Sequence, residues 1–204
     1  MSKTRIITIG RRFGSGGREI GKLLAEKLGI PFYDNELITA AAKESGLCDS
    51  FMESFEETPT NSLLYSLVMN AQNGGFYMGK PVELIAYEAQ INAVKAAASK
   101  GSCVIVGRCA DYILKDDYDV LSVFITASPE YRTKRTMAVE GVTEKEARAM
   151  MQRKDKARAS YHNYHAETKW GAADNYELCI NSERLTAEAA AELIITYMNS
   201  RNAE

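Results

Sequence analysis

Short apolar runs recur along the chain, and stretches with helical periodicity separate them. The runs lie at Arg5–Ile9, Ile30–Tyr33, Cys103–Val106, Val120–Thr126 and Glu177–Ile180. The third run is apolar throughout, which is typical of a strand covered on both faces. Strands that alternate with helices predict an α/β fold, in which a parallel sheet carries helices on both faces.

Local signals predict where several helices begin and end. An apolar stripe from Ile20 to Leu28 predicts a first helix, which Gly29 ends and Pro31 prevents from continuing. Ser128-Pro129-Glu130 reads as an N-cap followed by an acidic first turn, and Thr143 to Glu146 as a capping box.

The region from about residue 48 to residue 100 breaks the alternation. It has helical patterning and no convincing strand, and Val82 to Ser99 predicts one long helix. This is too much chain for a simple crossover between parallel strands. We expect one domain over residues 1–204, with a core of 1–47 and 101–204 and a helical insert near the ligand-binding edge of the sheet.

Composition narrows the class of protein. Hydrophobic residues make up 46% of the 204 residues, charged residues 25%, and the net charge is -2. This balance argues against a general nucleic-acid or membrane-surface binder. No stretch approaches the roughly 20 apolar residues of a membrane span, and no apolar signal segment precedes the first strand. Cys103 and Cys179 lie in apolar runs and are expected to be core thiols, so we expect a cytoplasmic protein in a reducing compartment.

A glycine-rich stretch, Gly14-Ser15-Gly16-Gly17, lies between the first strand and the first helix. Glycines let backbone N–H groups face an anion, and a helix N-terminus adds its positive dipole end. Arg11, Arg12 and Arg18 add charge around it. A plain turn with solvated arginines is one interpretation. A dinucleotide fingerprint is another, although Glu19 stands where its third glycine belongs. A degenerate phosphate loop fits best.

The stretch departs from the phosphate-loop pattern G-x-x-x-x-G-K-[ST] at defined positions. Arg11 stands at the first glycine, and Gly17 stands at the lysine. We expect Arg18 to replace the missing lysine in charge. The candidate phosphate-binding residues are Arg12, Phe13, Gly14, Ser15, Gly16, Gly17, Arg18 and Glu19.

Four segments together resemble a known family: "RIITIGRRFGSGGREIGKLLAEKLGIPFYDNELI", "SCVIVGRCADYIL", "VLSVFITASPEYRTKR" and "MMQRKDKARASYHNYHAETKWGAADNYELCINSERLTAEAAAELI". The sequence is similar to the cytidylate kinase-like family, a divergent branch of the P-loop nucleoside monophosphate kinases. The resemblance implies a five-stranded parallel sheet, an acceptor-binding helical insert, a short mobile lid at about residues 136–170, and the use of ATP with Mg²⁺. Ala157 and Ser160 stand where true cytidylate kinases contact their acceptor.

Three residues are candidates for binding the acceptor. Arg108 follows the third strand at the carboxyl edge of the sheet, where a guanidinium can grip a phosphate. A salt-bridged surface arginine is its alternative. Asp34 ends the second strand, where it can cap the helix starting at Asn35, face the acceptor, or do both. Asp111 follows two residues after Cys109, the residue next to Arg108.

Two basic helical stretches flank Gly141 and are either solvated faces or a lid that closes over phosphates. The candidate catalytic residues are Arg18, Arg135, Arg153, Arg158 and Asp155. Arg153 and Arg158 are separated by about 140° on a regular helix, so both cannot point straight at one ligand. Asp155 and Asp111 are candidates for reaching magnesium through water, or ordinary surface acids.

No side chain is assigned as a direct metal ligand. His162 and His165 are three positions apart, but no third ligand is evident. Trp170 is expected to pack the return path of the lid or an oligomer contact. The long insert favours a possible homodimer.

The function predicted from the sequence is ATP-dependent phosphoryl transfer to a small, nucleotide-like acceptor. A non-catalytic nucleotide or anion sensor that keeps the kinase fold is the alternative, supported by Gly17 at the lysine position. An oxidoreductase with a dinucleotide fold is a weaker third option, because Glu19 and the helical insert count against it.

Overall fold

The computed structural model describes residues 5–36, 76–77 and 80–201. It places the side chains of these residues except those of 76, 77 and 80–86. All strands of the main sheet run parallel, in the order β2-β5-β1-β6-β7. The strands are β1 (Ile6–Arg11), β2 (Phe32–Tyr33), β5 (Cys103–Val106), β6 (Val120–Thr126) and β7 (Leu178–Asn181). The predicted five-stranded parallel sheet is therefore confirmed.

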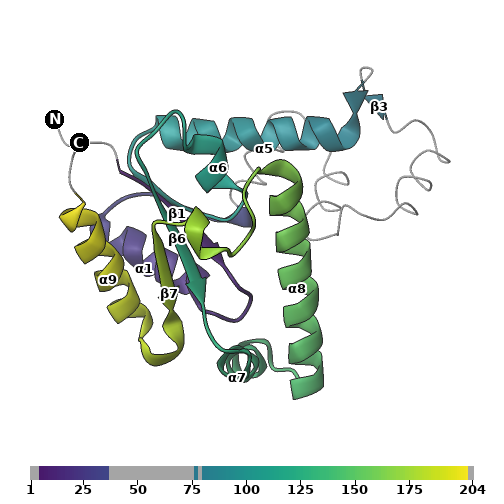
Figure 1. Cartoon of the computed structure of the whole chain (residues 1–204), viewed down its shortest axis with the longest axis vertical. Coiled ribbons are helices and arrows are strands. Elements are labelled where there is room, and N and C mark those ends of the chain that lie inside the picture. Colours follow the sequence, from purple (N-terminus) through teal and green to yellow (C-terminus); the bar gives the residue numbers. More distant parts are fainter. Residues whose placement is uncertain (1–4, 37–75, 78–79, 202–204) are drawn as a thin grey trace.

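Helices cover both faces of this sheet, as predicted (Figure 1). One face carries α1 and α9, and the other carries α5 and α6, while α7 and α8 lie beyond the end of β1. The helices are α1 (Gly17–Leu28), α5 (Val82–Ser99), α6 (Ala110–Leu114), α7 (Pro129–Glu140), α8 (Glu144–His165) and α9 (Ala187–Ser200), with short 3-10 turns η1 (Ala173–Asn175) and η2 (Ser182–Arg184).

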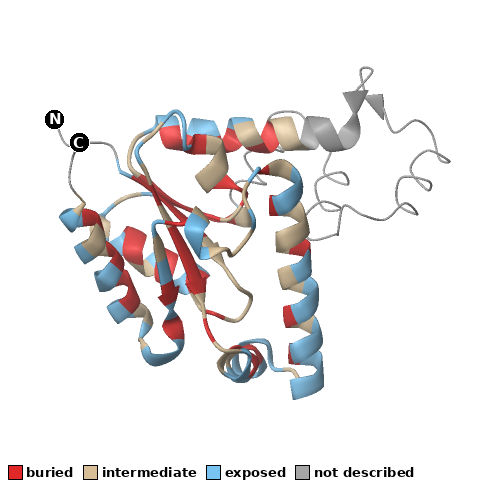
Figure 2. Cartoon of the chain, in the orientation of Figure 1, coloured by how far each residue is buried: buried red, intermediate tan, exposed pale blue. Residues whose placement is uncertain are grey.

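The sheet is the buried centre of the protein (Figure 2). Side chains alternate between its faces, so Ile7 and Ile9 pack with α1 and α9 while Ile6 packs with α5 and α6. Thr8 and Gly10 share a strand face with Ile6 but lie nearer the carboxyl end. Both residues line the cavity described below, and the Phe124 and Tyr176 rings pack closely against Gly10.

The predicted helix ends are confirmed. Gly29 ends α1 in the left-handed conformation, and the Ser128 hydroxyl accepts a hydrogen bond from the Tyr131 N–H at the start of α7. Both halves of the capping box between Thr143 and Glu146 are formed at α8. These contacts satisfy N–H groups that would otherwise lack partners at the helix ends.

β1 continues two residues beyond the predicted end. Its backbone keeps pairing with β6, with Gly10 opposite Phe124 and Arg11 opposite Ile125. The apolar pattern ends at Ile9 because the two following residues are a glycine and an arginine. Arg11 is therefore a strand residue, and its position is set by the sheet.

Two expectations need correction. The region from 48 to 100 was expected to hold no strand, but β3 (Phe76–Tyr77) and β4 (Lys80–Pro81) form an antiparallel pair too short to give an alternating pattern. Cys179 was expected in the core, but it is exposed on the edge strand β7, whereas Cys103 is buried.

The long helix predicted from Val82 to Ser99 is confirmed as α5. The rest of the predicted insert, residues 48–75 and 78–79, lies outside the described residues. Within the described chain, no helix is both long enough and apolar enough to cross a membrane.

Candidate functional site

The turn between β1 and α1 has the shape of an anion-binding loop. Gly14 and Gly16 both have positive φ, at 78° and 80°. The first backbone bond of α1 runs from the Ile20 N–H to the Gly16 carbonyl, so the N–H groups of residues 17–19 remain as donors at the helix end. Such donors together with the helix dipole suit a phosphate.

Contacts inside the protein hold this turn in place. A Cβ on Gly14 would lie 2.7 Å from Oγ1 of Thr136 and 2.8 Å from the carbonyl oxygen of Arg132, so α7 packs directly against the turn. The buried Ser15 hydroxyl donates a 2.8 Å hydrogen bond to the Arg12 carbonyl. The Ser182 hydroxyl donates to the Ser15 carbonyl at 2.7 Å. The Ser15 side chain therefore shapes the loop.

Arg18 and Asp34 form an ion pair. Nη2 and Nε of Arg18 lie 2.6 Å and 2.8 Å from the same carboxylate oxygen of Asp34. The other oxygen of Asp34 accepts the backbone N–H of Glu36 at 3.1 Å. Asp34 thus has the capping contact expected of it and binds Arg18 as well. The guanidinium expected to replace the loop lysine is directed to the end of β2.

Asp155 joins α8 to the loop and to α7. Its carboxylate accepts the Phe13 N–H at 2.7 Å, pairs with Arg132 at 2.8 Å, and lies 3.5 Å from Arg12. The predicted carboxylate is thus beside the phosphate loop, engaged by protein groups. Arg12 also lies over the Trp170 ring, with 5.3 Å from its guanidinium carbon to the ring centroid.

The other predicted lid arginines are placed differently from one another. Arg135 packs beside Gly16 and pairs with Glu19, so it lies next to the loop. Arg158 reaches the end of β1, where its Nη1 donates a 3.4 Å hydrogen bond to the Arg11 carbonyl. Arg153 is exposed and does not line the cavity described next. The expected angular separation of Arg153 and Arg158 explains this difference.

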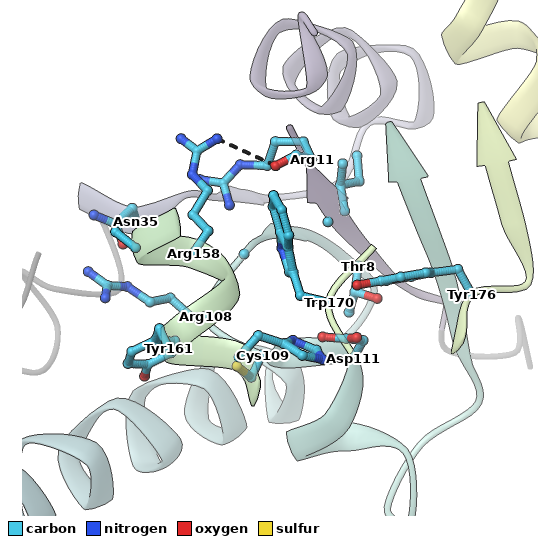
Figure 3. Close-up of a pocket in the computed structure, with 15 residues that line it drawn as sticks. Thr8, Arg11, Asn35, Arg108, Cys109, Asp111, Arg158, Tyr161, Trp170 and Tyr176 are labelled. Atoms are coloured by element: carbon cyan, nitrogen blue, oxygen red, sulfur yellow. Dashed lines mark hydrogen bonds between the residues drawn. The ribbon is translucent and has the colours of Figure 1, made fainter. Parts of the chain in front are cut away.

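A cavity of about 100 Å³ opens between β1, the segment after β5, and α8 (Figure 3). Its lining includes residues of each of these elements, together with Trp170 and Tyr176 from the chain that returns to β7. The predicted acceptor residues Arg108 and Asp111 line it, whereas Asp34 does not. Carboxyl ends of parallel strands are the usual ligand-binding edge of open α/β sheets.

One end of the cavity is cationic. Arg11, Arg108 and Arg158 line it from three separate parts of the chain (Figure 3). Burial lowers the pKa of Arg11 well below its usual value, and the positive charges of Arg158 and Arg108 lower it further. Burial likewise lowers the pKa of Arg158. Arg108 and Arg158 both repel the Arg11 guanidinium here, so a bound anion would relieve that repulsion.

The other end is aromatic and polar. Asp111, His162, Trp170 and Tyr176 line it with Thr8, whose buried Oγ1 has no hydrogen-bond partner among the described residues. Burial raises the pKa of the Asp111 carboxyl and lowers the pKa of the His162 ring. An unsatisfied buried hydroxyl is costly, so this end suits a ligand that brings a polar atom to Thr8.

The backbone between the two ends is strained. Gly107, Arg108 and Cys109 have φ angles of 81°, 58° and 52°. A non-glycine residue in this region costs on the order of 1–3 kcal/mol, and such strain gathers at functional sites. Burial raises the pKa of the Cys109 thiol, which disfavours its thiolate form.

The site offers few groups for a metal. The described residues contain no cluster of three or more side chains of the metal-ligating types. The loop N–H donors fit a polyphosphate, and a magnesium ion would be held mainly by phosphate oxygens and water, with Asp155 a carboxylate that contacts the loop. A magnesium ion bound in this way would neutralise part of the phosphate charge.

Several residues of the cavity were missed by the sequence interpretation, among them Arg11 and Tyr161. Arg11 was taken as general charge around the loop, and Tyr161 was given no role. Tyr161 lies 6.0 Å beneath the Arg108 guanidinium and donates a 2.6 Å hydrogen bond to Gln90. The sequence does mark Arg11, because it stands at the first-glycine position of the loop pattern. The direction of its side chain depends on packing against distant residues, which the sequence does not show.

A family model described as the cytidylate kinase-like family matches residues 6–184. The chain belongs to the cytidylate kinase-like family. A cytidylate kinase of Methanobrevibacter smithii is 24% identical over 195 residues, covering 95% of this chain and 98% of the relative. The family assignment covers both the loop and the cavity.

Solved structures share the fold of this chain. An uncharacterized protein from Eubacterium ventriosum has a TM-score of 0.73 and 36% identity, with 97% of this chain and 99% of the other covered. A shikimate kinase from Bacteroides thetaiotaomicron has a TM-score of 0.53 and 15% identity, with 96% and 99% covered, which shows a shared fold. Family and fold together support a nucleotide kinase-like role for the cytidylate kinase-like chain.

Proposed function

We propose that the protein transfers the γ-phosphoryl group of ATP to a small, nucleotide-like acceptor, with Mg²⁺ accompanying the donor. The donor phosphates bind at the turn of residues 12–19 and the acceptor binds in the adjacent cavity. An acceptor oxygen bonds to the γ-phosphorus while the bond to the β–γ bridging oxygen breaks. ADP leaves with that electron pair, and any acceptor proton passes to solvent.

One observation carries the proposal. Three guanidiniums, those of Arg11, Arg108 and Arg158, line one end of a single cavity beside an anion-binding turn. Phosphoryl transfer needs little covalent help from the protein and depends on positioning and charge neutralisation. The cationic end lies next to a helix N-terminus and suits the transferred phosphoryl group. The polar, aromatic end beyond it suits the rest of the acceptor.

The test is acceptor-dependent release of ADP. The purified protein is incubated with Mg²⁺ and ATP and with nucleoside monophosphates or small alcohols, and ADP is measured with and without each acceptor. We expect at least one acceptor to raise ADP release, and Arg158→Gln to reduce it about tenfold to a thousandfold because one transition-state cation is lost. Arg148→Gln is the matched control, since Arg148 is exposed and pairs with Glu144.

A non-catalytic nucleotide sensor is the second candidate. Two features favour it. Gly17 stands where the phosphate-loop pattern has its lysine, and the Asp155 carboxylate is already bound to Phe13 and Arg132. Mg-ATP binding without turnover on any acceptor would favour the sensor. Absence of ATP binding would contradict both candidates.

A further inference from the structure

We propose that Arg11 supplies, for the donor polyphosphate, the cation that a phosphate loop normally takes from a lysine at the position of Gly17. This inference rests on the proposed function, since it names a binding residue for the same ATP. It concerns the last residue of β1, which stands at the first-glycine position of the loop pattern.

The stem of Arg11 occupies the space in which a side chain at position 17 would begin. A Cβ on Gly17 would lie 2.6 Å from Cβ and 3.1 Å from Cγ of Arg11, and 3.3 Å from Cβ of Ile125. Real Cβ atoms do not approach other carbons this closely. A side chain at position 17 and the Arg11 side chain therefore compete for one space, and this chain has kept the arginine.

The head of Arg11 lies at the carboxyl end of β5. A Cβ on Gly107 would lie 2.5 Å from Nη1 of Arg11 and 3.2 Å from its guanidinium carbon. Gly107 has a φ of 81° and donates its N–H to the Ile9 carbonyl at 3.1 Å. The Arg11 side chain thus extends from the start of α1 to the turn that holds Arg108. Its guanidinium lies at the cationic end of the cavity.

The charge of Arg11 is not neutralised within the described part of the chain. Asp34 and Asp155 are the carboxylates that act on it electrostatically, but Asp34 is bound to Arg18 and Asp155 to Arg132. No described carboxylate lies at ion-pair distance from the Arg11 guanidinium. A partly buried guanidinium without an ion partner is unfavourable until an anion arrives.

The other arginines around the loop are engaged. Arg18 pairs with Asp34, Arg12 lies against Trp170 and Asp155, and Arg135 pairs with Glu19. Arg11 differs from them because its guanidinium lines the cavity.

The first test measures binding of Mg-ATP and of tripolyphosphate by calorimetry, with melting temperature as a check on folding. We expect Arg11→Gln to weaken both ligands by about tenfold to a hundredfold, the loss of one charged hydrogen-bonding partner. Arg11→Lys should retain part of the affinity, and Arg148→Gln should match the wild type. A folded Arg11→Gln variant that binds both ligands within twofold of wild type overturns the inference and leaves the proposed function standing.

The second test exchanges the two positions and stays informative if Arg11→Gln does not fold. Gly17→Lys alone should lower the melting temperature, because its side chain meets Arg11. Arg11→Gly should lose affinity, and Arg11→Gly with Gly17→Lys should regain it by about tenfold or more. A folded double variant that binds no better than Arg11→Gly contradicts the inference. Wild-type protein that binds neither ligand refutes the proposed function, and the inference with it.

Discussion

The backbone N–H of Phe13 donates a 2.7 Å hydrogen bond to the Asp155 carboxylate, so α8 is tied directly to the turn between β1 and α1. The same carboxylate pairs with the buried Arg132 of α7. One acid therefore joins the turn and two helices.

Asp155→Asn should destabilise the fold. The substitution leaves the Arg132 guanidinium, whose side chain is only 8% exposed, without its charged partner. Breaking a buried ion pair costs about 3–5 kcal/mol, and we expect the lower part of that range because Asn still accepts a hydrogen bond. Thermal unfolding should show a fall of roughly 6–12 °C. Asp116→Asn, at an exposed position, is the control; an equal melting temperature for both variants would show that the pair contributes little.

Gly14→Ala should lower the free energy of unfolding more than Gly29→Ala, although both glycines have positive φ. Nothing lies within 4 Å of a Cβ on Gly29, whereas one on Gly14 meets Thr136 and the Arg132 carbonyl. Backbone strain alone costs about 1–2 kcal/mol, and overpacking adds about 1–3 kcal/mol at Gly14. Urea unfolding of both variants separates the two terms. Equal losses would mean that α7 moves away from the turn at no cost.

His165 should make stability depend on pH. Burial lowers its pKa from 6.5 to about 4, with Tyr87 stacked on its ring at 3.7 Å and Tyr161 and Tyr164 beside it. Between these values the unfolded chain binds a proton at His165 and the folded chain does not. The free energy of unfolding therefore falls as pH falls from 6.5 toward 4.

Urea unfolding at about pH 7 and pH 5 measures this slope. His165→Gln should lose less stability on acidification than the wild type. Burial lowers the pKa of His162 in the same direction, so a residual slope should remain. An unchanged slope in the variant would mean that His165 titrates normally.

Arg18→Ala should leave Mg-ATP affinity within about threefold of wild type, in contrast to Arg11→Gln. The Arg18 side chain is 62% exposed, its guanidinium is bound to the buried Asp34, and it does not line the cavity. Calorimetry that compares the Mg-ATP affinity of Arg18→Ala with that of the wild type checks this prediction. A loss in Arg18→Ala as large as that in Arg11→Gln would restore Arg18 as the lysine substitute.

The sequence predicted the sheet and several helix boundaries because these depend on local patterns. Cys103–Val106 and Val120–Thr126 coincide with β5 and β6, and Thr143 begins α8 as its capping box indicated. Hydrophobic runs and caps act within a few residues, so they can be read along the chain.

The direction of long side chains could not be read in the same way. Arg11 and Arg18 both follow the first apolar run, yet one lines the cavity and the other binds Asp34. Arg153 is exposed while Arg158 of the same helix reaches β1. These outcomes depend on which distant element packs alongside. Cys179 is exposed because β7 is an edge strand, a property of strand order rather than of composition.

The competition between positions 11 and 17 restricts how this loop can evolve. A mutation that adds lysine at position 17 meets the existing arginine, and one that removes the arginine first leaves the loop without a side-chain cation in that space. Each single step is unfavourable alone, although the two together are compatible. On the proposal that Arg11 supplies the cation, a change to the lysine-bearing loop therefore requires both substitutions together.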